Sequence, residues 1–229
     1  GRQNRSSTDS CATHGQCRQG RGLYFALPTM ATADAMFGRA AKSVGGIFAN
    51  ASLTLAHGRA ALSEQFRNLI IKAGNDRRDG DEPGCTEWLG ESRRRALLAD
   101  VGVGTIDQAL MAVLPVKHQT LHHFGLSSKI LIVDEAHEMN KSYMAEELVA
   151  LLAMHRAAGG SAILLTATLP LDLRRRLLAT YNGTSESNAY PALTIAGGSA
   201  VTSFLADPRP VKGSVDVKRL ATSNDALDL

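Results

Sequence analysis

The sequence is poor in cysteine and has no long apolar run. Its 229 residues include three cysteines, Cys11, Cys17 and Cys85, and their spacing fits no metal-ligand motif. A sparse and odd number of cysteines indicates a reducing compartment and argues against a disulfide framework. No apolar run reaches the roughly 18 residues that a membrane-spanning helix needs, and the N-terminal residues lack the apolar segment of a signal peptide. We therefore expect a cytoplasmic protein with no membrane partner.

The chain also lacks a strong charge of either sign. It carries 25 Lys and Arg against 22 Asp and Glu, a net charge of +3. Such a weak basic excess permits nucleic acid as a partner but does not argue for it. With 44% hydrophobic residues, the composition is that of a globular protein with one sizeable core.

Two further features are missing at the N-terminus. The sequence does not begin with methionine, so we expect a fragment of a longer protein. Residues 1–21 are rich in Ser, Thr, Gln, Gly and Arg and show neither helical nor strand periodicity, which predicts a disordered tail.

From Gly22 onward, short apolar runs alternate with amphipathic segments. The runs at 22–28, 51–58, 101–105, 128–137 and 161–170 predict strands. Helical spacing predicts helices at 30–48, 59–74, 106–114, 117–124, 141–160 and 171–183, with partial helix at 86–99. In the second of these helices, Leu62, Phe66, Leu69 and Ile70 are expected to form the buried face. Strands that are apolar throughout and alternate with helices indicate an α/β fold with a mainly parallel sheet covered on both faces.

Beyond about Thr184 the pattern degrades. Residues 191–197 and 213–220 are candidate strands, separated by a proline-rich stretch. We expect 22–185 to form one domain and 186–229 to be a linker toward an absent second domain.

The chemistry centres on the stretch ILIVDEAH, which ends at His137. In an open parallel sheet, ligands bind beyond the carboxyl ends of the strands, where Asp134 and Glu135 are expected. An Asp at this place can hold Mg²⁺, and a neighbouring Glu can orient and deprotonate an attacking water. His137 is placed to relay between a nucleotide and a neighbouring domain. The alternative is a solvated acidic loop that caps the next helix.

The stretch LLTATLP contributes Thr166 and Thr168 after another apolar strand. Their hydroxyl groups are expected to bond the acidic residues of the adjacent strand. Taken alone, Thr166 and Thr168 would be an ordinary threonine-rich strand end. Their functional interpretation depends on the acidic residues Asp134 and Glu135.

Two strand-to-helix turns predict phosphate contacts. Pro28 and Thr29 form the first turn, and free amides at a helix N-terminus bind phosphate; the alternative is a plain N-cap by Thr29 or Thr32. Gly104 and Thr105 form the second turn, where Thr105 caps the helix or holds a phosphate. Two such turns on one sheet edge would make a track for a nucleic-acid strand that carries no sequence information.

Three histidines near one predicted helix allow a weaker prediction. His118 and His122 are four residues apart, and this spacing can bind a metal. No further ligand motif accompanies them, so a partly exposed helix face is the favoured interpretation for His118, His122 and His123.

Taken together, these motifs resemble the superfamily-two helicases, and most of all the helicase-nuclease of type I CRISPR systems. The stretches that carry the resemblance are GLYFALPTMATADAMFGR, LAHGRAAL, GVGTIDQALMAVLPVKHQTLHHFGLSSKILIVDEAHEMN and LLTATLP. The third is the most specific, since a generic DEAH protein would not be expected to carry GTIDQALMAVLPVKH before its acidic box. The resemblance covers roughly 22–181.

The resemblance implies a fold and a set of roles. It implies the first RecA-like motor domain, a P-loop NTPase three-layer sandwich that uses ATP and Mg²⁺. Asp134 would bind Mg²⁺ and Glu135 would activate water, while His137, Thr166 and Thr168 would couple hydrolysis to movement. Pro28, Thr29, Gly104 and Thr105 would grip single-stranded DNA. The family unwinds and degrades invading DNA opened by a guide-RNA surveillance complex.

Much of the family pattern is missing from this sequence. It contains no G-Xaa₄-G-K-[ST] motif, and we identify neither a second motor domain nor a nuclease domain. In the family, the helix that follows the phosphate loop runs directly into the GLYFALP strand. Back-translation of residues 2–20, read one nucleotide later, permits GKTEAALTLAQRMANAGKG, the end of a phosphate loop and its helix. We hypothesise that residues 1–21 are a frame-shifted reading of this segment.

Three functions remain open. The first is a DNA-helicase motor domain that is incomplete and inactive alone. The second is a remnant that binds nucleic acid but does not hydrolyse ATP, favoured by the missing lysine. The third is another superfamily-two helicase that acts on RNA.

Overall fold

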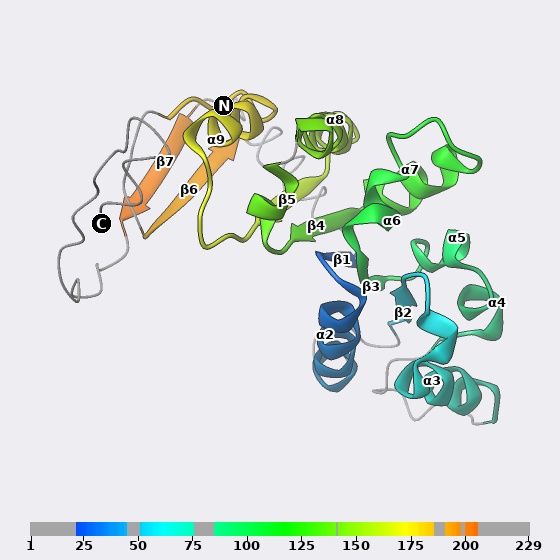
Figure 1. Ribbon diagram of the computed structural model, residues 1–229. Coiled ribbons are helices and arrows are strands. Elements are labelled where there is room, and N and C mark those ends of the chain that lie inside the picture. Colours follow the sequence, from blue (N-terminus) through cyan, green and yellow to red (C-terminus); the bar gives the residue numbers. More distant parts are fainter. Residues whose placement is uncertain are drawn as a thin grey trace, which may run out of the picture.

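The computed structural model describes residues 22–44, 51–75, 85–140, 142–185, 191–197 and 200–205. The anomalous segment 1–21 and the candidate strand 213–220 lie outside these residues. Within them, five strands form one sheet in the order β2-β3-β1-β4-β5, and every neighbouring pair is parallel. The predicted parallel α/β architecture is therefore confirmed (Figure 1).

The strands correspond to the five apolar runs of the sequence. They are β1 (Gly22–Leu27), β2 (Leu53–Ala56), β3 (Val101–Thr105), β4 (Lys129–Val133) and β5 (Ser161–Leu164). The longer helices are α2 (Met30–Ser43), α3 (Glu64–Asn75), α7 (Gln119–Ser127), α8 (Ser142–Ala157) and α9 (Leu171–Ala179). The short ones are α4 (Glu87–Gly90), α5 (Arg93–Ala96), α6 (Ile106–Leu110), η1 (Ala60–Leu62) and η2 (Ala136–Asn140).

Each face of the sheet has its own core. Tyr24 and Leu131 are fully buried on the face that α6, α7 and α8 cover. On the opposite face, Leu55 and Val103 are buried beneath α2 together with Phe37. The three layers follow from strands that are apolar on both sides.

A buried polar cluster fixes the start of β4. Lys129 donates hydrogen bonds from Nζ to the carbonyl groups of Leu97 and Gly125, the first at 2.6 Å. His155 of α8 donates from Nε2 to the carbonyl groups of Leu126, at 3.2 Å, and Lys129, at 3.0 Å. Burial lowers the pKa of Lys129 to about 8. These bonds join α7, α8 and β4, so they anchor the strand that leads to the acidic pair.

Three sequence predictions differ from the structure. Leu62, predicted to face the core, is 73% exposed because the helix starts anew at Glu64, after η1. His118 precedes α7 instead of lying on it. Because its φ is 69°, its backbone is not helical, and His118 and His122 are not separated by one helical turn. Within the segment predicted as a linker, β6 (Ala192–Gly197) and β7 (Ala200–Leu205) form an antiparallel hairpin, of which only β6 was predicted.

Candidate functional site

The predicted site residues lie at one edge of the sheet. Because all five strands are parallel, the turns that follow them lie at the same edge. In the order of the sheet, these turns contribute His57, Thr105, Thr29, Asp134 and Thr166. The acidic pair and the threonine stretch are direct neighbours, since β4 pairs with β5.

The turn after β4 holds Glu135 in an unusual backbone conformation. The amide of Asp134 donates to the carbonyl of Ala26 in β1 at 3.0 Å, and the amide of Ala136 donates to the carbonyl of Leu165 at 2.9 Å. Glu135 lies between these two anchors with φ of 52°, in the left-handed region that a glutamate rarely adopts. Backbone strain of this kind is typical of functional sites and persists only where the surrounding contacts fix it.

A polar chain links the acidic turn to the threonine stretch. Glu135 Oε2 lies 3.2 Å from His137 Nδ1, and the same nitrogen lies 3.2 Å from Thr166 Oγ1. Thr166 donates its hydroxyl proton to the carbonyl of Thr168 at 2.7 Å, so it accepts a hydrogen bond from His137. We expected the threonine hydroxyl groups to bond the acidic residues; the histidine lies between them instead.

One carboxylate oxygen in this chain is buried without a hydrogen bond. Glu135 Oε2 is shielded from water, and its contact with His137 has the distance of an ion pair but not the direction of a hydrogen bond. A buried acceptor in this state is costly, and the imidazole of His137 is the polar group that lies beside it.

The turn after β4 also fixes the carboxylate of Asp134, the residue predicted to bind Mg²⁺. Its Oδ1 accepts a hydrogen bond from the amide of Glu135 at 3.0 Å, which orients the carboxylate. Among the described residues, no group of three or more His, Cys, Asp or Glu side chains could form a metal cage. A single carboxylate fits Mg²⁺, which takes one or two protein oxygens and completes its shell with water and phosphate.

The turn after β1 forms a complete capping box. Thr29 Oγ1 accepts from the amide of Thr32 at 3.2 Å, and Thr32 Oγ1 accepts from the amide of Thr29 at 3.2 Å. Thr29 is thus the N-cap of α2, one of the two residues that the alternative interpretation of this turn allowed, and the phosphate contact stays a prediction. Pro28 lies directly before the capping residue.

The turn after β3 is more buried than predicted. Thr105 is 6% exposed, and its side chain does not cap α6, contrary to one of our expectations. Its carbonyl accepts a hydrogen bond from the Tyr24 hydroxyl at 3.3 Å. Gly104 packs so closely that an added Cβ would lie 2.3 Å from the carbonyl oxygen of Ala56. Any ligand contact at this turn therefore uses backbone atoms.

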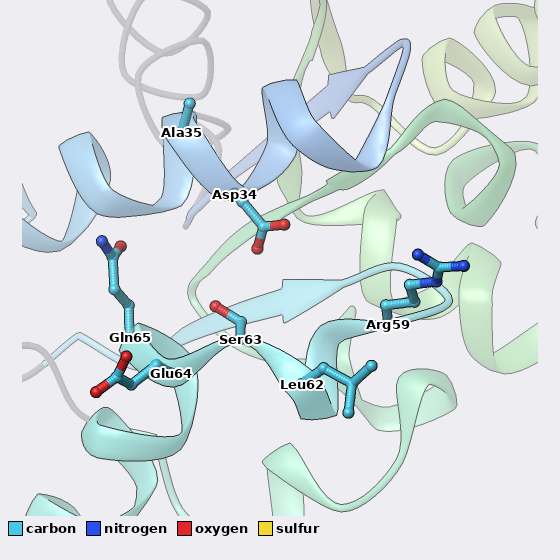
Figure 2. Close-up of a pocket in the computed structure, with 7 residues that line it drawn as sticks. All are labelled: Asp34, Ala35, Arg59, Leu62, Ser63, Glu64 and Gln65. Atoms are coloured by element: carbon cyan, nitrogen blue, oxygen red, sulfur yellow. The ribbon is translucent and has the colours of Figure 1, made fainter.

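Sequence reasoning gave no role to the turn after β2. His57 is 1% exposed, accepts from the amide of Arg59 at 3.1 Å, and lies 3.3 Å from Asp34 Oδ1 of α2. Beside it, Asp34 and Arg59 line an open hollow of about 590 Å³ between α2 and the start of α3 (Figure 2). Neither Asp134 nor Glu135 lines this hollow. In the sequence, His57 and Gly58 come at the end of an apolar run, just as the candidate residues of the other turns do.

The histidine metal site is not formed. His122 is buried and donates from Nδ1 to the carbonyl of Gln108 at 3.1 Å. His118 is exposed and lies outside α7. The favoured helix-face interpretation is also wrong for His122, because that side chain belongs to the core.

No protein-family model matches the chain, but individual proteins do. It is 36% identical over 218 residues to the CRISPR-associated endonuclease/helicase Cas3 of Escherichia coli, and this match covers 90% of the chain and 24% of the relative. The Cas3 protein of Thermus thermophilus is 36% identical over 87% of the chain and 22% of that protein. The chain thus spans about a quarter of the length of these relatives.

Solved structures agree with these matches. The crystal structure of T. fusca Cas3-AMPPNP superposes with a TM-score of 0.66 and 32% identity, covering 88% of the chain and 24% of that protein. T. fusca Cas3-ATP gives a TM-score of 0.64 and 33% identity, covering 80% of the chain and 21% of that protein. The expected RecA-like three-layer fold is therefore confirmed.

Proposed function

Since this chain belongs to the Cas3 family of CRISPR-associated helicase-nucleases, we propose that its helicase-type domain is the first ATP-driven motor domain of such a protein. The observation that carries the proposal is the polar chain from Glu135 through His137 to Thr166, beside Asp134 at the ligand-binding edge of the sheet. A solvated acidic loop would not hold its glutamate in a strained turn that is anchored on both sides.

ATP with Mg²⁺ is the proposed cofactor pair. Crystal structures of a relative, T. fusca Cas3, are described as Cas3-ADP, Cas3-AMPPNP and Cas3-ATP. In this chain Asp134 would hold Mg²⁺, which neutralises charge on the phosphates. Glu135 would orient the attacking water and take its proton, with its Oε2 held beside His137.

His137, Thr166 and Thr168 form the proposed coupling element. Their bonds join the turns after β4 and β5. A change at Glu135 that moves His137 would therefore reach the threonine stretch without passing through the core. This link would transmit the state of the nucleotide to bound DNA.

Single-stranded DNA is the proposed track. The amides at the start of α2 after Pro28 and Thr29, and the backbone of Gly104 and Thr105, lie at the same sheet edge as the acidic pair. Contacts of this kind position a phosphate backbone without reading its sequence. The partner that supplies the opened DNA would be the guide-RNA surveillance complex of a type I CRISPR system, in the cytoplasm.

The 229-residue chain by itself is proposed not to hydrolyse ATP. Its sequence contains no phosphate-loop lysine motif. A lysine on the β- and γ-phosphates is a recurring part of phosphoryl transfer in this class of enzyme.

The test is ATP hydrolysis stimulated by single-stranded DNA. We expect no turnover above background for the purified chain. We expect turnover once residues 1–21 are replaced by the shifted reading and the second motor domain of a relative is appended. In that restored protein, Glu135→Gln should lower kcat by about 10²–10⁴-fold. Glu138→Gln is the matched control, since this exposed carboxylate lies 3.7 Å from the other nitrogen of His137.

Two results would contradict the proposal. Turnover by the unmodified chain that Glu135→Gln abolishes would overturn its inactivity alone. Equal losses in the two Glu→Gln variants would remove Glu135 from the role of base. If the restored protein binds single-stranded DNA with no hydrolysis, the second candidate, a nucleic-acid-binding remnant, is favoured.

A further inference from the structure

A second hollow lies beside the turn after β2. This strand ends the sheet order, and α4 and α5 pack beside it (Figure 1). Thr54 of β2 donates its hydroxyl proton to the carbonyl of Ala96 at 2.7 Å, which fixes the end of α5 against the strand. A hollow of about 310 Å³ remains between residues 57–61 and residues 90–94, and we call it the β2 pocket. Neither Asp134 nor Thr166 lines it, so it is separate from the acidic site.

The floor of the β2 pocket is apolar. Leu55 and Ala60 line it and are buried. His57 also lines it, but Nδ1 of its ring accepts from the amide of Arg59 at 3.1 Å, and Nε2 lies 3.3 Å from Asp34 Oδ1. Both ring nitrogens are therefore engaged within the protein. The floor offers contact surface to an occupant and no free imidazole nitrogen.

The rim of the β2 pocket carries polar groups without a structural task. Arg94 is exposed, and its guanidinium group makes no hydrogen bond or ion pair with any residue that the structure describes. Ser92 precedes α5, but its hydroxyl group does not cap the helix. The acid on the rim, Glu91, accepts a hydrogen bond from Arg95 at 3.2 Å, which offsets its charge. The charge left at the mouth is the positive charge of Arg94.

The β2 pocket lies in line with the proposed DNA track. The turn after β1 neighbours the turn after β3, and the turn after β3 neighbours the turn after β2. A strand held at Thr29 and then at Gly104 and Thr105 therefore reaches the turn after β2 next. Gly58 of that turn is exposed and lines the β2 pocket. The pocket thus opens where this line of phosphate contacts ends.

The size and chemistry of the β2 pocket fit one nucleotide unit. Its volume is near the lower bound of about 300 Å³ for small-ligand pockets. An apolar floor accepts a planar base, and an arginine at the mouth binds a phosphate group through charge-assisted hydrogen bonds. Because the histidine nitrogens are engaged, the fit depends on the shape of the base more than on its hydrogen-bonding edge.

We propose that the β2 pocket takes one base turned out of the bound single strand, while Arg94 and Ser92 hold the phosphate of that nucleotide. The strand is then held through a base as well as through its backbone. This inference rests on the proposed function for the strand itself. A free nucleotide has the same chemistry, and the experiment separates the two sources.

The test compares two labelled oligomers that bind to the full 229-residue chain without ATP. Both are about 12 nucleotides long, within the usual site size for a single strand. One is a thymidine oligomer, whose bases stack little in the free strand, and the other is the abasic deoxyribose-phosphate chain. We expect the thymidine oligomer to bind at least about tenfold more tightly in fluorescence anisotropy, since only this oligomer buries a base.

A substitution that fills the β2 pocket makes the test specific. Ala61 is exposed in η1 and lines the pocket, so Ala61→Phe puts a ring where the base would lie and changes no charge. It should lower the affinity for the thymidine oligomer to that for the abasic chain and leave the abasic chain unaffected. Ala153→Phe is the matched control, because Ala153 is exposed on α8 and does not line the pocket. It should alter neither affinity.

A second substitution tests the phosphate contact at the rim. Arg94→Gln should weaken binding of the thymidine oligomer. It should also lower the slope of the logarithm of the binding constant against the logarithm of the salt concentration by about 0.7, the value for one phosphate contact on a single strand. Arg67→Gln is the control, because Arg67 is exposed on α3 and does not line the pocket. It should leave the affinity and the slope as they are.

The results separate a failure of the β2 pocket from a failure of the track. Equal affinities of the unmodified chain for the two oligomers overturn the pocket and leave the track in place. The same holds if Ala61→Phe binds thymidine as the unmodified chain does. If thymidine monophosphate binds and only its binding is lost in Ala61→Phe, a free nucleotide is the occupant and the proposal is wrong. Failure to bind either oligomer overturns the track and the pocket together.

Discussion

At the scale of single residues, two buried histidines are held neutral by the fold. Burial lowers the pKa of His122 and of His155, and the neighbouring charges of Arg94 at His122 and of His123 at His155 act in the same direction. Their carbonyl hydrogen bonds oppose this shift without cancelling it. Both therefore bind a proton less readily when folded than the ordinary value of about 6.5.

The sign of the resulting pH dependence follows from proton linkage. Below about pH 6.5 the unfolded chain protonates these histidines more readily than the folded chain does, so unfolding is favoured as the pH falls. We expect these two histidines to make the free energy of unfolding fall as the pH drops below about 6.5. Each histidine contributes a slope of at most about 1.4 kcal/mol per pH unit. Urea denaturation at several pH values measures this.

Substitution of a single histidine shows how much of the pH dependence of the free energy of unfolding it causes. His155→Gln keeps a donor for the carbonyl groups of Leu126 and Lys129 and should remove part of the acid dependence. An unchanged slope in His155→Gln would contradict the assignment.

The candidate site was partly predictable at this scale. The residues Asp134, Glu135, His137 and Thr166 were identified from two short motifs after apolar strands, and the structure brings them together. The position of His137 between the glutamate and the threonine was not predictable. It depends on the left-handed turn at Glu135, which a sequence pattern does not encode.

At the scale of elements, glycine in β3 allows two strands and a tyrosine to pack closely. A Cβ on Gly104 would meet the carbonyl oxygen of Ala56 at 2.3 Å and the Tyr24 hydroxyl at 2.5 Å. Neither atom can move without disturbing β2 or the bond from Tyr24 to Thr105.

Two Gly→Ala substitutions should therefore differ in sign. Gly104→Ala is expected to destabilise the chain by about 1–3 kcal/mol through overpacking. Gly38→Ala, within α2, meets only the end of the Gln65 side chain at 2.7 Å, which can rotate away. It should stabilise the helix by up to about 1 kcal/mol. Thermal unfolding of both variants compares them, and a stable Gly104→Ala would show that the two strands can separate without loss.

Helix ends were harder to predict than helix existence. The segment 59–74 reads as one amphipathic helix, yet it divides into η1 and α3 at Ser63. Leu62 is exposed because the phase of the apolar face restarts with α3. By contrast, the sequence narrowed a cap of α2 to Thr29 or Thr32, since the capping box that these two residues form is local and independent of tertiary contacts.

At the scale of the whole molecule, Arg156 of α8 makes hydrogen bonds to the turn that follows α9 and so links the two helices. Arg156 donates from Nη1 to the carbonyl of Thr180 at 2.6 Å and to Asn182 Oδ1 at 3.0 Å, and its guanidinium lies 5.9 Å from the ring of Tyr181. Arg176, in contrast, reaches only across the surface to Glu146 at 2.6 Å, with both side chains well exposed.

These two arginines give a matched pair of Arg→Lys substitutions. Arg156→Lys loses the planar fork that serves two acceptors and the ring, so we expect a loss of about 1 kcal/mol in the free energy of unfolding. Arg176→Lys should cost less than about 0.5 kcal/mol, as an exposed ion pair contributes little. Chemical denaturation of both variants checks this, and equal losses would contradict it.

No helix among the described residues is long and apolar enough to cross a bilayer.

The sequence by itself determined the parallel α/β class, the order of elements from Gly22 to β5, the acidic pair and the family. These depend on local periodicity, on strand-end motifs and on stretches such as GTIDQALMAVLPVKH, all of which are written in consecutive residues. Only the tertiary structure decided the burial of Thr105, the exclusion of His118 from α7, and the exposure of Ile163 in the apolar strand β5. Each of these depends on contacts between residues far apart in the chain, because burial is set by what packs across a face and not by the residue itself.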